Sequence, residues 1–370
     1  MGRELNNTDA GFMRLALREA RKGLGRTSPN PSVGAVIVKD GKVAATGYHR
    51  SAGLPHAEVE ALSQLGGRCP GATLYVTLEP CNHTGRTPPC THAILNSGIQ
   101  RVVVGMKDPN PGVAGGGCAF LERHGVEVTV GVLEGECRRL NEDFVRFVTS
   151  KRPFVIAKSA MTLDGWTATS TGHSKWITNE ASRAFVHRLR DRVDAVLVGI
   201  GTVLADNPSL TARLKRGRGR DPLRIIVDTH LRTPRNARVV TQDSSARTLI
   251  VTGKDPSPVD CRGFPEGRVS IMTCPLRNGK IDLTALAARL GEMSVMSLLV
   301  EGGAGIIGSL LRDRLIDKCY LFKAPKLLCG GDGIPMAAGP GPREMSDALV
   351  LKEIRVRRFK DDILIRGYPS

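Results

Sequence analysis

Residues 73–90 read TLYVTLEPCNHTGRTPPC, and this stretch largely decides the fold predicted for the first part of the chain. Its opening run, Thr73–Leu78, is short, mostly apolar and rich in β-formers, which is typical of a strand. Pro80-Cys81 follows the end of this run, and a loop rich in Pro leads to Cys90, where a helix is predicted to begin. A strand, a loop and a helix in succession form the repeating unit of an α/β sheet.

The sequence around this stretch alternates in the same way. The expected elements are a helix capped by Thr8, a hairpin around Asp40-Gly41, a helix after Pro55, strands at Arg101–Gly105 and Val126–Val130, and helices at Ala119–His124 and Gly135–Val148. Such alternation predicts a sheet between layers of helices, a three-layer α/β domain.

A second domain is expected after Lys151-Arg-Pro153, because proline interrupts a helix. At 370 residues the chain exceeds a typical single domain of ~100–200 residues, and we predict domains at 1–150 and 151–370. The second half also reads as α/β, with apolar central strands. Its expected elements are strands at Phe154–Met161, Ala195–Gly199, Leu223–Asp228, Thr248–Thr252 and Ser297–Glu301, a helix at Glu180–Arg190, and loops at Arg213–Asp221 and Pro256–Gly267.

Composition narrows the class of protein. The chain has no apolar run of the ~20 residues that a membrane span requires, and its N-terminus lacks the apolar core of a secretory signal. Nine irregularly spaced cysteines indicate free thiols in a reducing compartment, so we expect a cytoplasmic protein. The net charge of +17 is uneven: residues 1–150 hold 17 basic and 14 acidic side chains, and the remainder holds 36 and 22. The positive charge of the second half could serve to bind nucleic acid or small phosphorylated ligands, or it could be merely a solvated basic surface.

One imidazole and two thiols point to a metal site in the first half. His56 begins a predicted helix, and Cys81 and Cys90 flank the loop described above. Three such ligands leave one tetrahedral position of zinc open, which is typical of a catalytic rather than a structural site. Zinc then activates water for attack on a ring carbon that bears an amine.

Glu58 is the expected proton carrier, provided that the metal lies off the helix N-terminus where His56 and Glu58 can both point. A His-x-Glu motif followed by Pro-Cys and a second Cys is typical of zinc deaminases, although here eight residues separate the cysteines instead of two. A structural zinc site with His83 or His92 as fourth ligand is the alternative. His83 itself suits either a substrate contact or a place in the loop.

Two strand ends of the second half are candidate ligand sites. Gly303, Gly305 and Gly308 have the G-x-G-x-x-G spacing that lets a backbone approach a pyrophosphate at a helix N-terminus. A plain Gly-rich turn is the alternative. Gly199–Pro208 is expected to be a second strand-end loop that exposes a hydroxyl and a carboxylate.

Several motifs together closely resemble the bifunctional deaminase/reductase family of riboflavin biosynthesis. They are Pro29–Gly34, His56-Ala-Glu58, Glu79–Cys90, Asp108-Pro-Asn-Pro111, Thr202–Pro208 and Glu301-Gly-Gly303, in the family's order and across nearly the whole chain. The resemblance implies a cytidine-deaminase-like domain followed by a dihydrofolate-reductase-like domain, with Zn²⁺ and NADPH as cofactors. It also implies deamination of 2,5-diamino-6-ribosylamino-4(3H)-pyrimidinone 5′-phosphate, then reduction of the ribosyl chain to ribityl.

The resemblance assigns further residues by motif. Contacts to the deaminase substrate are implied for Asn30, His49, Ala57, His83 and Arg86. Contacts to the nicotinamide cofactor are implied for Ala160, Trp176, Thr202, Asp206, Thr229, Gly303, Ala304, Gly305, Ile306, Ile307, Gly308 and Ser309. Contacts to the reductase substrate are implied for Ser174, Arg190, Leu210, Arg213 and Glu301.

Among these residues, Arg190 and Arg213 suit a phosphate clamp, because a guanidinium pairs two oxygens at once. Trp176 is expected to lie against the nicotinamide or to fill the core, and Asp206 to assist protonation. The expected partners are a small phosphorylated pyrimidine and other copies of the chain, with no nucleic acid and no membrane.

Two rival interpretations remain at this point. A nucleic-acid deaminase would use the basic half as its platform, but aromatic residues make up only 4% of the chain, too few for extended base stacking. A non-enzymatic module with degenerate sites conflicts with the complete set His56, Glu58, Cys81 and Cys90.

Overall fold

The computed structural model describes residues 8–84, 88–111, 116–215, 217 and 219–370. Contacts between Cα atoms divide it into two compact units, Met1–Lys151 and Arg152–Ser370, each described here by itself. Within the described ranges no helix is long and apolar enough to cross a membrane. All nine cysteines fall in these ranges, and each is a free thiol.

The first unit contains one mixed sheet. Its described strands lie in the order β2-β1-β3-β4-β5, antiparallel around β1 and parallel from β3 to β5. The elements are α1 (Asp9–Ala20), η1 (Arg21–Gly23), β1 (Gly34–Lys39), β2 (Lys42–Tyr48), α2 (Ala57–Ser63), β3 (Thr73–Val76), α3 (Cys90–Ser97), β4 (Arg101–Val104), α4 (Gly117–Arg123), β5 (Glu127–Val130), α5 (Glu134–Leu140) and α6 (Glu142–Ser150).

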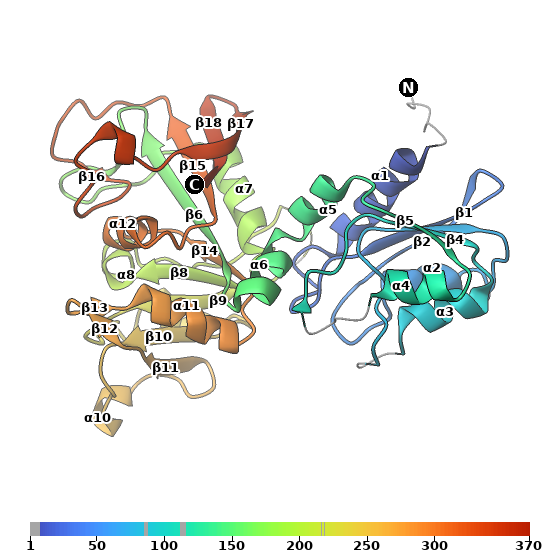
Figure 1. Ribbon diagram of the computed structural model, residues 1–370. Helices are drawn as coiled ribbons and strands as arrows, with labels where there is room; N and C mark the ends of the chain where they lie inside the picture. Colours follow the sequence, from blue (N-terminus) through green and yellow to red (C-terminus); the bar gives the residue numbers. More distant parts are fainter. Residues whose placement is uncertain (1–7, 85–87, 112–115, 216, 218) are drawn as a thin grey trace. The chain divides into compact units, whose positions relative to one another are not determined.

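Helices cover both faces of this sheet (Figure 1). A β-carbon at Gly34 would overlap the backbone of α1, and one at Gly47 would overlap the backbone of α2. Gly34 pairs with Tyr48, so Gly34 and Gly47 point to opposite faces. The three-layer architecture predicted for this half is therefore confirmed.

Sequence and structure differ at the end of the first unit. A single helix was expected over Gly135–Val148, whereas α5 and α6 are separate helices that meet at Asn141. The backbone of Asn141 leaves the helical region there, with φ −114° and ψ 31°. Apolar periodicity alone does not reveal such a break, because both helices bury one face.

The second unit has one large sheet, ordered β11-β10-β9-β8-β14-β6-β15-β18-β17 among the described strands. Neighbours from β11 to β15 pair in parallel, and β15, β18 and β17 are antiparallel. The elements are β6 (Phe154–Thr162), β7 (Trp166–Ala168), α7 (Glu180–Arg190), β8 (Ala195–Gly199), α8 (Ile200–Asp206), β9 (Leu223–Val227), α9 (Arg238–Thr241), β10 (Thr248–Thr252), α10 (Pro258–Cys261), β11 (Val269–Thr273), β12 (Leu276–Arg277), β13 (Lys280–Ile281), α11 (Leu283–Glu292), β14 (Ser297–Val300), α12 (Ala304–Arg312), β15 (Lys318–Ala324), β16 (Ile334–Pro335), η3 (Met345–Asp347), β17 (Leu351–Phe359) and β18 (Asp362–Pro369).

The central strands of this sheet are buried on both faces, as their continuous apolar runs predict. Leu197 and Ile225 belong to a core on the face covered by α11 and α12. Val196 and Ile226, one position along, belong to a core with α7, α8 and α9. Two predicted loops are in part helical: α8 occupies most of Gly199–Pro208, and α10 lies within Pro256–Gly267.

Candidate active sites

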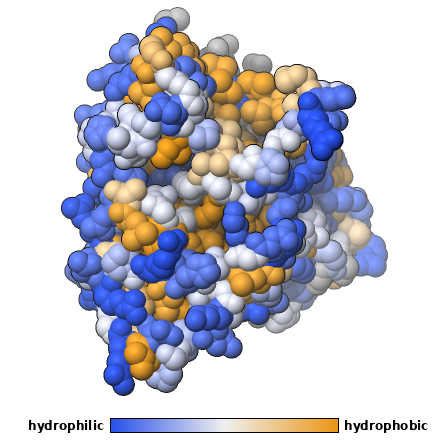
Figure 2. Space-filling model, turned by 90° about the vertical axis from the view of Figure 1, so that its left-hand side faces the viewer, coloured by the Kyte–Doolittle hydropathy of each residue, from blue (hydrophilic) through white to orange (hydrophobic). Residues whose placement is uncertain are grey.

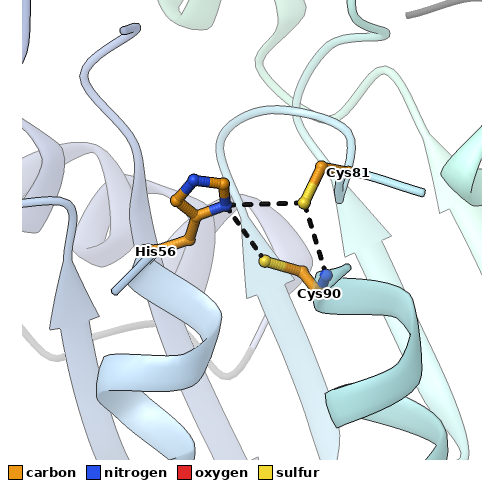
Figure 3. Close-up of side chains that lie close together, drawn as sticks. All are labelled: His56, Cys81 and Cys90. Carbon is orange, nitrogen blue, oxygen red and sulfur yellow. Dashed lines mark hydrogen bonds between the residues drawn. The ribbon is translucent and has the colours of Figure 1, made fainter. Parts of the chain in front are cut away.

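His56, Cys81 and Cys90 converge at one end of the first unit (Figure 3). His56 immediately precedes α2, Cys81 lies beyond β3, and Cys90 is the first residue of α3. The His56 Nδ1 atom is 3.2 Å from Cys90 Sγ and 3.5 Å from Cys81 Sγ. Three separate segments thus bring one nitrogen and two sulfur atoms to the same point.

This arrangement fits zinc. The three ligand atoms all lie within 4.8 Å of one another. Zn–N and Zn–S bonds of ~2.0–2.3 Å at tetrahedral angles place nitrogen and sulfur about 3.5 Å apart, close to the distances observed. His83 and His92 do not join this cluster within the described residues, which disfavours the four-ligand alternative. The ring of His92 instead lies 5.7 Å from that of Phe120.

Glu58 lies beside the three ligands, in the first turn of α2. Its side chain is 3% exposed, and among the described residues its Oε2 atom has no hydrogen-bond partner. Burial raises the pKa of this carboxyl to about 7, although the nearby His56 opposes the rise. A carboxyl with a pKa near neutrality can both accept and return a proton.

The two thiols differ in acidity. A hydrogen bond from the Cys90 side chain is the main cause that lowers the pKa of Cys81 to about 4, against the effect of burial. The backbone N–H of Cys90 also donates to Cys81 Sγ at 3.3 Å. The same contact and burial raise the pKa of Cys90, so without metal the pair retains one proton. Thiolate is thus favoured at Cys81, and the metal-free site does not favour it at Cys90.

Several residues expected to contact the deaminase substrate surround this cluster. The ring of His49 lies edge-on to that of His56, 5.2 Å between centroids, and Asn30 Nδ2 lies 3.1 Å from His49 Nε2. Ala57 is fully buried in α2, and His83 is exposed. Arg86 lies outside the described residues.

The second candidate site lies at one edge of the parallel part of the large sheet, where several strands end. Strands β9, β8, β14 and β6 run in the same direction, so the segments that follow them meet at one edge. Thr202 follows β8, Thr229 follows β9, and Glu301 follows β14. Gly302 lies against Thr202, because a β-carbon at Gly302 would be 3.1 Å from Thr202 Oγ1.

The Gly-rich motif opens helix α12. Gly303 has a φ of 85° and caps the helix, which favours glycine. A β-carbon at Gly308 would overlap the backbone of Ala338, so this glycine serves packing. The side chain of Ile307 is 4% exposed and belongs to the core, which leaves only its backbone for a ligand. Ala304, Gly305, Ile306 and Ser309 complete the first turns of the helix.

A buried ion pair lies at the same edge of the sheet. Arg190 Nη2 is 2.8 Å from Glu301 Oε2, and Arg190 Nε approaches Glu301 Oε1, so the fork of the guanidinium faces this carboxylate. Burial opposes ionisation of Glu301, yet the contacts with Arg190 lower its pKa overall. The phosphate-clamp hypothesis for Arg190 stays a prediction, and the structure adds that Glu301 faces both arms of the fork while Arg190 Nη1 donates to Thr211 O.

Lys158 is a charged residue of this site that the sequence analysis missed. It lies on β6, beside Glu301 in the continuation of the β14–β6 register. Burial lowers the pKa of its ammonium group, and Arg190 acts in the same direction while Glu301 opposes it. The available signal was a single charge inside the otherwise uncharged run Phe154–Met161.

The other residues predicted to bind ligands in the second unit differ in their burial and in their hydrogen bonds. Ser174 Oγ donates to Asp206 Oδ1 at 3.3 Å, and Lys175 Nζ lies 3.7 Å from the same oxygen. Ala160 is half-buried on β6, and the carbonyl of Thr229 accepts from Gly253 N. Leu210 is 3% exposed, so its side chain belongs to the core. Arg213 is exposed.

Trp176 does not fill the core. It is 61% exposed, and the guanidinium of Arg183 lies 4.6 Å from its ring centroid. Figure 2 shows apolar patches interrupted by polar surface on the face that carries α8, α12 and β16. The exposed apolar side chains of this unit include Leu163, Trp176, Leu204, Leu327 and Ile334.

Comparison with known proteins supports this division into two sites. Residues 6–106 match the family model of the cytidine and deoxycytidylate deaminase zinc-binding region, and residues 153–365 match that of the RibD C-terminal domain. The protein is thus of the class that joins a zinc-dependent deaminase to a reductase. The first unit has the cytidine-deaminase-like fold and the second the dihydrofolate-reductase-like fold.

Relatives over the full length identify the family. The chain is 44% identical to the riboflavin biosynthesis protein RibD of Aquifex aeolicus, over 98% of each chain. It is 39% identical to RibD of Escherichia coli, over 96% of this chain and 98% of that one. The crystal structure of a diaminohydroxyphosphoribosylaminopyrimidine deaminase/5-amino-6-(5-phosphoribosylamino)uracil reductase from Thermotoga maritima superposes with a TM-score of 0.87 at 40% identity, covering 98% and 99% of the two chains.

The chain belongs to the RibD family. It is a bifunctional enzyme of riboflavin biosynthesis, a hydrolase and an oxidoreductase that uses Zn²⁺ and NADPH.

Proposed function

We propose that residues 1–150 deaminate 2,5-diamino-6-ribosylamino-4(3H)-pyrimidinone 5′-phosphate, and that residues 151–370 reduce the ribosyl chain of the product to ribityl. The observation that carries this proposal is the three-ligand cluster with the buried Glu58 beside it. Its donor set suits a catalytic zinc ion, since three protein ligands leave one coordination position open. A zinc ion held by these three side chains would act as a Lewis acid and make water a stronger nucleophile.

Glu58 moves the protons of the deamination. Its carboxyl accepts one proton from the attacking water and delivers it to the ring nitrogen, and it then carries a second proton from the added hydroxyl to the amine, which leaves as ammonia. Burial supports this role, because it raises the pKa of the carboxyl to about 7 and excludes competing water.

Asn30 and His49 orient the pyrimidine. His49 Nδ1 lies 3.1 Å from the carbonyl oxygen of Pro55, to which it donates, so His49 Nε2 accepts the hydrogen bond from Asn30 Nδ2. Burial is the main cause that lowers the pKa of His49, in agreement with a neutral ring. The amide oxygen of Asn30 then points away from His49 and serves a donor on the substrate.

The edge of the parallel sheet binds the cofactor and the sugar phosphate of the second reaction. NADPH bound at this edge would supply the hydride for carbon C1′ of the opened sugar. The N-terminus of α12 suits the pyrophosphate of the cofactor, because backbone N–H groups there point outward. Arg190 holds the carboxylate of Glu301 toward the substrate, and Asp206 assists protonation.

We also propose that copies of this chain associate into a homo-oligomer. Strand β17 lies at the edge of the large sheet and exposes Val350, Ile354 and Val356 in or beside it, by 57–63% each. An exposed edge strand with apolar side chains can pair with another copy. Sedimentation velocity distinguishes this from a monomer.

The experiment that tests the two reactions is an assay on zinc-loaded protein with the diaminopyrimidine ribosylamine phosphate. Ammonia release and NADPH absorbance are followed separately. We expect ammonia first and NADPH loss afterwards. Ammonia without NADPH loss would refute the second assignment, and absence of ammonia would refute the first.

A further inference from the structure

Asn141 connects the end of the first unit to the loop that carries Asn30. It lies between α5 and α6 and is 1% exposed. Its Oδ1 atom accepts the backbone N–H of Ser32 at 2.8 Å, and its Nδ2 atom donates to the carbonyl of Ser32 at 3.1 Å. One side chain thus satisfies both backbone polar groups of a residue 109 positions away.

Ser32 ends a short loop whose other end is also held. The hydroxyl oxygens of Ser32 and Thr27 are 3.2 Å apart and buried. The backbone N–H of Asn30 donates to Thr27 O at 2.8 Å. Pro29 and Pro31 flank Asn30 and restrict its backbone further. The position of Asn30 therefore depends on two anchors, Thr27 and Ser32.

The contacts continue from this loop to the metal ligands. Asn30 binds His49, and His49 binds the carbonyl of Pro55, directly before His56. The side-chain hydrogen bonds of Asn141 go to Ser32, so its effect on the site passes through this loop.

We propose that Asn141 is a positioning residue of the deaminase, which sets the place of Asn30 by holding the backbone of Ser32. The inference rests on the proposed function, in which Asn30 contacts the pyrimidine. According to this proposal, the junction of α5 and α6 affects how tightly the substrate binds and has little effect on the attack on the ring.

The test is a double-mutant cycle on the full-length, zinc-loaded enzyme. Asn141→Ala is expected to raise the KM of deamination about tenfold with a smaller change in kcat, because small misplacements of an orienting group are costly. In an Asn30→Ala background, the same substitution is expected to change KM much less, since coupled residues are not additive. Zinc content and the reduction of the deaminated intermediate are expected to stay unchanged.

Ser97→Ala is the matched control. Ser97 is also 1% exposed in the first unit, and its hydroxyl makes two hydrogen bonds, to Ile94 O and from Ile99 N, at the far end of α3. Its loss is expected to lower thermal stability and to leave KM unchanged. Asn141→Asp is the second variant should Asn141→Ala fail to fold, because it keeps the acceptor for Ser32 N–H and replaces the donor to Ser32 O with a carboxylate oxygen that repels it. We expect it to raise KM as well.

Three outcomes would overturn the inference. The first is an unchanged KM in a folded Asn141 variant, and the second is a full, multiplicative effect in the Asn30→Ala background. The third is a wild-type enzyme that releases no ammonia from the diaminopyrimidine substrate, which would remove the proposed function as well. The first two leave the deaminase assignment intact, so the failures are distinguishable.

Discussion

At the scale of single residues, the deaminase site depends on a buried carboxyl, one oxygen of which has no hydrogen-bond partner among the described residues. Glu58 Oε2 is enclosed beside three metal ligands, in the first turn of α2. An unpaired buried polar atom lowers the stability of the folded protein, and most buried polar groups are therefore hydrogen-bonded. The proton transfer proposed for Glu58 accounts for this cost.

Glu58→Gln is expected to lower the rate of ammonia release by roughly 10²–10⁴-fold, because an amide cannot take up the proton of water. Zinc content, measured by atomic absorption, is expected to remain that of the wild type, since Glu58 is not one of the three ligands.

Glu60→Gln is the control on the same helix, where Glu60 pairs with the exposed Arg50. It is expected to retain deamination. Full activity in Glu58→Gln would contradict the role of the carboxyl.

At the scale of elements, ion pairs that join distant segments differ in their contribution to stability. Arg190 on α7 pairs with Glu301 beyond β14, and their side chains are 13% and 6% exposed. On the same helix, Glu180 pairs with Lys215, and these side chains are 69% and 74% exposed. Breaking a buried pair strands a charge, whereas solvent replaces an exposed one.

Glu301→Gln is expected to lower the free energy of unfolding of the second unit by roughly 3–5 kcal/mol, because Arg190 is left buried without its counter-ion. Glu180→Gln, the matched control, is expected to lower it by at most ~1 kcal/mol. Urea denaturation monitored by circular dichroism measures both. Equal losses of unfolding free energy in the two variants would show that the buried pair stabilises the protein no more than the exposed pair does.

A second ion pair predicts a pH effect in the first unit. Asp9 on α1 accepts two hydrogen bonds of 2.9 Å from Arg101 on β4, and a third from Tyr75. The hydrogen bonds from Arg101 lower the pKa of Asp9 below its ordinary 3.8, against the opposing effect of burial. The stabilisation is therefore present above that value and is lost as the pH falls through the lower pKa of the folded state.

Between about pH 6 and pH 3, the urea midpoint of the wild type is expected to fall more steeply than that of Asp9→Asn at the acid end. Arg101→Gln is expected to flatten the profile too, because it removes the cause of the lowered pKa. Parallel profiles for all three proteins would refute this assignment.

At the scale of the whole molecule, the two reactions use separate compact units. The cluster that fits zinc lies within Met1–Lys151, and the sheet edge assigned to NADPH lies within Arg152–Ser370. The division falls one residue from the predicted boundary. Arg152, at the start of the second unit, pairs with the buried Asp317 of that unit.

Removal of zinc by a chelator is expected to abolish ammonia release and to leave reduction of the deaminated intermediate unchanged. It is also expected to lower the melting temperature of the first unit only, since a ligand at 1,000 times its Kd stabilises by about 4 kcal/mol. Zinc is expected to restore both properties. Magnesium is not, because it prefers oxygen ligands. Loss of both activities on chelation would contradict independent sites.

Local patterns were enough to predict much of this protein. Turn residues and apolar periodicity act over a few positions and were enough to predict several elements. These elements are the hairpin at Asp40-Gly41, the helix Glu180–Arg190 and the strands Ala195–Gly199 and Thr248–Thr252. The three side chains predicted to hold zinc were recognised from a His-x-Glu motif and two cysteines, and the structure brings their donor atoms within 4.8 Å of one another. Strands β15, β17 and β18 were missed, and the exposed, charged β17 owes its place to pairing with β18.

Tertiary structure decided what joins residues far apart in the chain. The sequence suggested Arg190 as a ligand of phosphate but did not indicate that Glu301, 111 positions away, lies in the fork of its guanidinium. Lys158 and Asn141 carried no recognised motif, and only their neighbours in space, Glu301 and Ser32, reveal a role. The physical reason is that hydrogen bonds and ion pairs depend on distance in space, whereas periodicity and motifs record only distance along the chain.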